Sequence, residues 1–109
     1  TTRRSSDLLP MIRSLRVRLM LAAAVLALLR DNPSLKLSVE GHTDDTGQAA
    51  RNRELSQQRA QSVVAALTAG GIDAARLVAA GYGAERPVAG NDSEQGRARN
   101  RRVELVRRG

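Results

Sequence analysis

The stretch GHTDDTG, residues 41–47, joins two different sequence patterns. Before it, residues 35–40 alternate apolar and polar side chains, which is typical of a half-buried strand. After it, residues 48–69 carry apolar side chains at helical spacing, which predicts a long helix. Short polar side chains at a strand-to-helix junction lie beside a helix N-terminus, so this stretch is the predicted site. We expect Gly41 and Gly47 to permit the backbone angles of a sharp turn.

Composition limits what kind of protein this is. The chain has 109 residues, 41% of them hydrophobic, which fits one domain with an ordinary core. Cysteine is absent, which excludes disulfides and thiolate metal sites and leaves the compartment undecided. The net charge of +7 indicates either an anionic partner or a solvated basic surface. Because Tyr82 is the only aromatic residue, the chain lacks a stacking platform, and we expect no nucleic-acid partner.

The N-terminal third combines a polar start with an apolar helix. Residues 1–8 show no periodic apolar pattern and are predicted to be a loose lead-in to a domain over residues 9–109. Residues 10–30 favour a first helix. Its second half, residues 19–29, is apolar all round but shorter than the roughly 20 residues that cross a bilayer, so we expect no direct membrane insertion. Such a helix packs on two sides, within the domain or against a partner chain. Because the chain does not begin with methionine and shows no cleavable signal, we expect it to be part of a longer protein.

The remaining pattern predicts a small sheet. Residues 77–83 and 102–107 are predicted strands, and a short helix over residues 94–99 precedes the second of them. Glycines at 70 and 71 end the long helix, and Asp73 caps a single turn. The predicted fold class is therefore α+β, a small mixed sheet with two long helices packed on one face.

These residues carry a family resemblance. The chain resembles the OmpA-like C-terminal domain, the peptidoglycan-binding module of OmpA-type porins, peptidoglycan-associated lipoproteins and flagellar stator proteins. The match lies in VEGHTDDTG at 39–47, LSQQRAQSV at 55–63, GYG at 81–83 and GRARNRRVEL at 96–105. The resemblance implies a βαβαβ-type architecture whose first strand is expected to be missing, because residues 1–9 offer only a fragment of the usual first strand and loop. It also implies non-enzymatic binding of peptidoglycan, which anchors a larger, outer-membrane-associated envelope protein in the periplasm of a Gram-negative bacterium.

The resemblance also implies a ligand and its contacts. The family's ligand is the peptide stem of peptidoglycan, held mainly through meso-diaminopimelate. By motif position, Asp44 and Arg59 are the ligand contacts, with Thr43, Asn52 and Arg101 in support. Diaminopimelate carries an ammonium and a carboxylate on one carbon, so Asp44 would take the ammonium and Arg59 the carboxylate, which a guanidinium meets bidentately. The alternative is that Asp44 and Arg59 form an internal ion pair.

The sequence also raises the alternatives of a metal site, an enzyme and a self-associating module. One histidine next to two adjacent aspartates lacks the spacing of a metal site, so we expect no metal and no cofactor; we expect His42 to be buried and bonded to backbone, and Asp45 to bond its own turn. A cell-wall amidase-type enzyme is an alternative class, but no nucleophile with a histidine partner is present, so no catalytic residue is assigned. A third class is a self-associating structural module, a homodimer formed through the N-terminal third, because a missing first strand leaves an open sheet edge.

Overall fold

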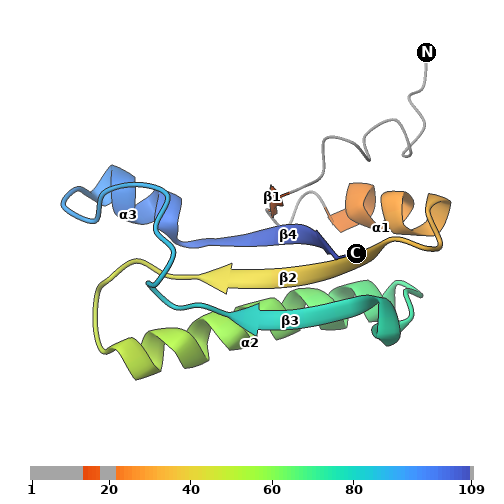
Figure 1. Cartoon of the computed structure of the whole chain (residues 1–109), viewed down its shortest axis with the longest axis horizontal. Coiled ribbons are helices and arrows are strands. Elements are labelled where there is room, and N and C mark those ends of the chain that lie inside the picture. The colour runs from red at the N-terminus through yellow and green to blue at the C-terminus, as the bar shows by residue number, and fades with distance from the viewer. Residues whose placement is uncertain (1–13, 18–21, 109) are drawn as a thin grey trace, which may run out of the picture.

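The computed structural model describes residues 14–17 and 22–108, and within them a single mixed sheet carries the fold (Figure 1). The elements in chain order are β1 (Ser14–Val17), α1 (Ala22–Asp31), β2 (Lys36–His42), α2 (Ala49–Ala69), the 3-10 helix η3 (Ala74–Arg76), β3 (Leu77–Gly81), α3 (Glu94–Asn100) and β4 (Arg102–Arg108). The predicted α+β class is confirmed. The strands at β2, β3 and β4, the long helix and the short helix lie within one or two residues of their predicted positions.

The sheet has the order β1-β4-β2-β3 across its described strands. β2 and β3 are parallel, and α2 makes the crossover between them, while β4 pairs antiparallel with both β2 and β1. The carboxyl ends of β2 and β3 and the start of β4 therefore lie at one end of the sheet, where α2 begins and α3 sits (Figure 1). Three connections of the chain meet at this end.

The core lies between the sheet and its helices. Leu37 and Val39 alternate onto one face of β2 and are completely buried there, beside Leu105 of β4. Both α1 and α2 contribute to the same cluster, so both helices pack on this face, as predicted. The buried apolar residues are Val25, Leu28, Leu29, Leu35, Leu37, Val39, Ala60, Leu67, Ile72, Leu77 and Leu105.

Gly41 and Gly47 are needed for different reasons. Gly47 has a φ of +90°, which fits the turn predicted for it. Gly41 has no positive φ, so that part of the prediction is wrong. A Cβ at Gly41 would lie 2.1 Å from the backbone oxygen of Ser56, so glycine is needed there because α2 crosses β2 in direct backbone contact. Two predicted caps are confirmed. Gly70 is the C-cap of α2, and the Asp73 carboxylate accepts the Ala75 N–H as the N-cap of η3.

The predicted first helix over residues 10–30 is wrong at residues 14–17, and its residues 10–13 and 18–21 lie outside the described part of the chain. Residues 14–17 form β1, and α1 begins only at Ala22. The SLRV sequence also alternates polar and apolar residues, and β4 offers a strand edge with which it pairs from Ser14↔Val106 to Val17↔Val103. This tertiary pairing outweighs the helix propensity of leucine and arginine. The expectation of a missing first strand is therefore also wrong, and the β4 edge is not open.

The predicted lead-in over residues 1–8, and the start of the predicted domain at residue 9, lie outside the described residues. Among the helices that the structure does describe, none combines the length and the apolar character that a membrane span requires.

Candidate functional site

The predicted site lies where β2 ends and α2 begins, and the pairing of β2 with β4 completes it. His42 is the last residue of β2, and its register partner is Arg102, the first residue of β4. Asp44 stands two residues beyond His42, and Arg101 stands one residue before β4. The antiparallel register therefore brings together two side chains that are 57 positions apart in the sequence.

Asp44 is held in one orientation from two sides. Its Oδ1 accepts the backbone N–H of Thr46 at 2.9 Å, and its Oδ2 accepts a hydrogen bond from Nη1 of Arg101 at 2.7 Å. The bond from the Thr46 N–H, followed by the bond from Arg101, lowers the pKa of the Asp44 carboxyl. The residue is only 8% exposed. The site therefore presents a fixed carboxylate that stays ionised at neutral pH.

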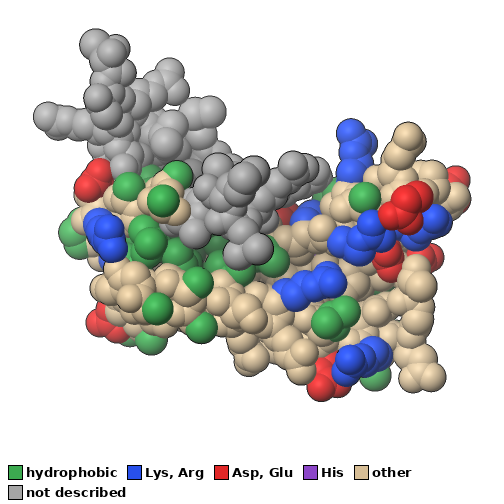
Figure 2. Space-filling view, turned by 180° about the vertical axis from the view of Figure 1, so that it is seen from behind, with side chains coloured by type: hydrophobic (Ala, Val, Ile, Leu, Met, Phe, Trp, Pro, Cys, Tyr) green, Lys and Arg blue, Asp and Glu red, His purple; other side chains and the backbone are tan. Residues whose placement is uncertain are grey.

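Arg101 is shared between two carboxylates. Its Nη2 donates to Oε1 of Glu94 at 2.6 Å, and the other oxygen of Glu94 accepts from Nε of Arg97 at 3.2 Å. The bonds from Arg101 lower the pKa of Glu94, and the bonds to Glu94 and Asp44 raise the pKa of Arg101. Seen from behind, Lys and Arg side chains gather at the end of the molecule that carries α3, with Asp and Glu side chains among them (Figure 2). This chain of ion pairs ties α3 to the site loop.

Thr43 and Asn52 shape the loop around Asp44. The hydroxyl of Thr43 donates to the Asp44 carbonyl at 2.7 Å, and its backbone N–H donates to the carbonyl of Gly83 at 2.9 Å. The side-chain amide of Asn52 donates to the carbonyls of Thr46 at 3.1 Å and Asp44 at 3.4 Å. Both residues are buried, so their side chains hold the backbone of residues 43–46 and do not project into solvent.

Arg59 is not brought into contact with Asp44. It is exposed on α2 and makes no ion pair or hydrogen bond within the described part of the chain, so the alternative of an internal Asp44–Arg59 pair is wrong. Seven positions after Asn52, Arg59 lies about 10 Å further along the helix and within about 20° of the same side. Arg53 and Gln57 face the loop and strand around β3, through contacts with Glu85 and the Ala79 carbonyl, so Arg59 lies on the opposite flank of α2. Side chains on a helix are generally directed toward its N-terminus, and the N-terminus of α2 is the end near Asp44.

His42 belongs to a layer of side chains on the sheet face opposite α2. It is 1% exposed, and its ring stacks on Tyr82 with centroids 5.6 Å apart. The guanidinium carbon of Arg86 lies over the Tyr82 ring, 3.7 Å from the ring centroid. Nε2 of His42 lies 3.5 Å from Oε2 of Glu104, which accepts from Nε of Arg102 at 2.6 Å. Burial, and next the charge of Arg102, lowers the pKa of His42 to about 4.

Two expectations for single residues are therefore corrected. His42 is buried as predicted, but neither ring nitrogen has a hydrogen-bond partner in the described structure, so it is not bonded to backbone. The turn-forming carboxylate is that of Asp44, whereas Asp45 is exposed. Glu94 was not singled out from the sequence. The available signal was its spacing from Arg97 and Arg101, three and seven positions later on one side of a short helix.

Comparisons with known proteins agree with the sequence resemblance. The sequence profile of the OmpA family matches residues 16–101. The chain is 44% identical over 82 residues to the protein named "Probable lipoprotein YiaD" from Escherichia coli (strain K12), covering 75% of this chain and 37% of that protein. It is 50% identical over 72 residues to outer membrane porin F of Pseudomonas fluorescens, covering 66% of this chain and 22% of the porin.

Two further similar proteins have names that refer to peptidoglycan. The peptidoglycan-binding protein ArfA of Mycobacterium tuberculosis (strain H37Rv) is 40% identical over 78 residues, covering 72% of this chain and 24% of ArfA. The crystal structure of the peptidoglycan-associated lipoprotein from Burkholderia pseudomallei superposes with a TM-score of 0.79 at 30% identity, covering 90% of this chain and 92% of that chain. The chain thus spans nearly all of the superposed lipoprotein chain but well under half of the length of these curated relatives.

Proposed function

Because the chain belongs to the OmpA family, we propose that it binds peptidoglycan non-covalently, through the meso-diaminopimelate of the peptide stem, and so anchors a larger envelope protein to the cell wall. This family consists of binding domains and not enzymes, so the amidase alternative is set aside. The relatives named as outer-membrane or peptidoglycan-binding proteins support a place in the periplasm. One of those relatives is mycobacterial, so the Gram-negative source stays a prediction from the sequence.

The observation that carries the proposal is the state of Asp44. Its carboxylate is fixed, ionised and placed at the carboxyl end of β2. A carboxylate has about four lone-pair directions, and the Thr46 N–H and Arg101 use two of them, which leaves acceptor capacity for an ammonium group. Arg59, exposed and unpaired among the described residues, supplies the guanidinium for the carboxylate on the same carbon.

The supporting residues have separate parts in this proposal. Thr43 and Asn52 keep the loop backbone in place, so that Asp44 does not have to be ordered when the ligand arrives. Arg101 stands beside the ammonium position and would repel it, but Glu94 holds the second nitrogen of the same guanidinium. This second pair offsets part of the positive charge next to Asp44.

The test compares single variants for binding to purified cell-wall sacculi. Asp44→Asn and Arg59→Ala should each lower the affinity by about tenfold to a hundredfold, since each removes a charge-assisted hydrogen bond to the ligand. Arg59→Lys should weaken binding less, because the charge survives while the bidentate fork is lost. Arg107→Ala, which removes an exposed arginine of β4, is the matched control and should bind normally. Binding that survives in both Asp44→Asn and Arg59→Ala would contradict the proposal.

The ligand is tested by competition. Free meso-diaminopimelate, or a stem peptide that contains it, should displace the domain from sacculi, whereas a lysine-containing stem should compete poorly because it lacks the second carboxylate. Salt should weaken binding only moderately, since few charges take part. Equal competition by both stems would contradict the diaminopimelate assignment, and equally tight binding to DNA with steep salt dependence would favour the basic-surface alternative.

Self-association through the N-terminal third is a separate proposal with one argument left. The β4 edge is covered, because β1 pairs with β4, and the edge strands of the described sheet are β1 and β3. The remaining argument is α1, whose exposed residues are the small apolar Ala23, Ala24 and Ala27 together with the charged Arg30 and Asp31. Sedimentation velocity at high protein concentration is the measurement, and a purely monomeric species would contradict a homodimer.

A further inference from the structure

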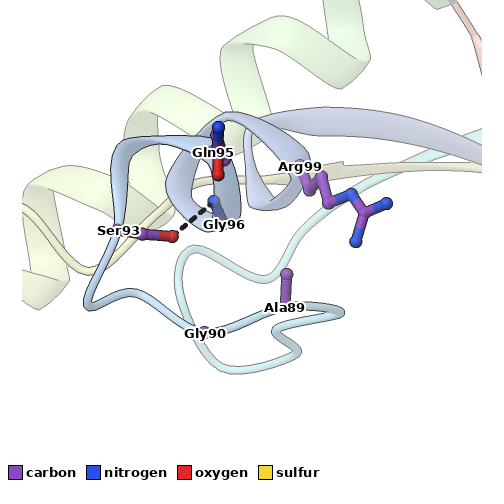
Figure 3. A pocket seen from close by; sticks show the side chains of 6 residues that line it. All are labelled: Ala89, Gly90, Ser93, Gln95, Gly96 and Arg99. Atoms are coloured by element: carbon purple, nitrogen blue, oxygen red, sulfur yellow. Dashed lines mark hydrogen bonds between the residues drawn. The ribbon is translucent and has the colours of Figure 1, made fainter.

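A cavity of about 540 Å³ lies between α3 and the loop that leads into it (Figure 3). Its lining residues are Ala89, Gly90, Ser93, Gln95, Gly96 and Arg99. At about 100° per residue, Gln95 and Arg99 share one side of α3, while Glu94 and Arg97 point to the side that faces Asp44. The cavity is therefore separate from the Asp44 site, with α3 between them.

One wall of this cavity is held by Asn100, which is completely buried. Its Oδ1 accepts the backbone N–H groups of Val88 at 2.8 Å and Ala89 at 3.0 Å. Its Nδ2 donates to the carbonyl of Ala89 at 2.9 Å and to Oδ1 of Asn91 at 2.8 Å. Nη1 of Arg97 adds a bond to the Asn91 carbonyl at 3.0 Å. The loop is thus fixed against α3 by the protein's own contacts, without a ligand.

The floor is a direct contact between backbones. A Cβ added at Gly96 would lie 1.8 Å from the Gly90 carbonyl oxygen, so only glycine lets α3 approach the loop this closely. The hydroxyl oxygen of Ser93 accepts the Gly96 N–H at 3.0 Å and orders the turn between them (Figure 3). The backbone of the cavity is therefore ordered before a ligand binds, so no loop has to be ordered on binding.

The polar groups around the cavity are uncommitted. Arg97 and Arg101 are engaged with Glu94 and Asp44, but Arg99 makes no ion pair or hydrogen bond with any described residue. Gln95 is exposed and also lacks such a bond, and the hydroxyl of Ser93 still has its proton to donate. Arg99 is the only charged side chain of the lining, so the cavity favours an anion.

The geometry points to a second ligand site, one that takes a carboxylate next to an amide, namely the C-terminal carboxylate of a peptide stem. Arg99 receives the carboxylate, and Gln95 with Ser93 bonds the adjacent peptide amide. This inference rests on the proposed function, because the polymer held at Asp44 is the source of the second carboxylate. A planar guanidinium suits a carboxylate better than a compact ammonium would.

The test is an NMR titration of the ¹⁵N-labelled chain with N-acetyl-D-alanyl-D-alanine, followed at the amides of the cavity lining. The dipeptide should shift these amides, and its C-terminal amide derivative, which lacks the carboxylate, should not. Arg99→Ala should weaken binding by about tenfold and Arg99→Lys by less. Arg107→Ala, an exposed arginine outside the cavity, should leave the dipeptide affinity unchanged.

Three results would overturn the inference: equal affinity of Arg99→Ala and the unchanged chain, equal binding of the amide derivative, or equal shifts with inorganic phosphate. None of these involves Asp44. A parallel titration with meso-diaminopimelate, followed at the amides of residues 43–46, reports on the Asp44 site, so failure of the proposed function and failure of the second site give different results.

Discussion

The single histidine of the chain should make the fold sensitive to mild acid. His42 is buried against Tyr82, and the charged groups that affect its pKa are Arg102, Glu104 and Arg86. Burial, reinforced by Arg102, lowers its pKa from an ordinary 6.5 to about 4 in the folded state. A protonated imidazole would have to stay buried, with the Glu104 carboxylate 3.5 Å from Nε2 and no hydrogen-bond partner at Nδ1 in the described structure.

The sign and size of the effect follow from proton linkage. Above about pH 7.5 neither state binds the proton, so His42 adds no pH dependence. Between pH 6.5 and pH 4 the unfolded chain binds a proton that the folded chain does not, so stability falls as the pH falls. With these two pKa values the loss is about 2 kcal/mol at pH 5 and approaches roughly 3 kcal/mol below pH 4. The pKa of Asp44 is lowered below its ordinary value, so this carboxylate remains ionised at pH 5 and contributes nothing to that loss.

Urea unfolding followed by circular dichroism at pH 7.5 and pH 5.0 measures this loss in the unchanged chain and in His42→Gln. The variant keeps a polar side chain of similar reach but cannot take up a proton, so it should lose about 2 kcal/mol less than the unchanged chain between the two pH values. Comparing the two proteins cancels the carboxylates that both contain. The same pH dependence in both, or an NMR titration of the His42 ring near pH 6.5 in the folded protein, would refute the reasoning.

Three stability predictions follow from single contacts. Asn100→Asp keeps two of the four hydrogen bonds to the loop over residues 88–91, turns the other two into oxygen–oxygen contacts, and should cost about 3 kcal/mol of unfolding free energy in urea. Arg76→Ala removes three hydrogen bonds to carbonyls at the end of α1 and the start of β2, and should lower the melting temperature through a loss of about 2 kcal/mol, with Arg107→Ala as the neutral control. Gly41→Ala should push α2 off β2, because its Cβ would lie 2.1 Å from the Ser56 oxygen, and a folded domain with unchanged melting temperature would contradict this.

Elements whose pattern is local were predictable from the sequence. The long helix, the strands β2 and β3 and the caps at Gly70 and Asp73 follow from periodicity and turn chemistry within a few residues. β1 was not, because four alternating residues inside a leucine-rich run become a strand only when a partner edge is available. That edge belongs to β4, almost 90 residues later in the sequence, so the propensities of residues 14–17 alone cannot predict the pairing.

The contacts of the candidate site also separate into local ones, which the sequence predicts, and long-range ones, which it does not. The motif identified Asp44 and placed Thr43 and Asn52 beside it, since all three lie around one junction. The motif also named Arg101 as a supporting residue, but it did not predict that Arg101 pairs directly with Asp44, nor that Glu94 holds that arginine. These contacts depend on where the last turn of α3 lies relative to the loop that carries Asp44.

The Asp44–Arg101 contact is a consequence of the strand register that buries the core. The pairing that places Val39 opposite Leu105 also places His42 opposite Arg102, since both pairs belong to one antiparallel ladder. A slip of one residue would turn Leu105 from the buried face to the other face of the sheet, which apolar burial opposes. The same slip would change the distance between the ends of β2 and β4 and break the 2.7 Å bond between Asp44 and Arg101. The apolar alternation of the two strands, although it lies outside the site, therefore determines which guanidinium stands beside the carboxylate.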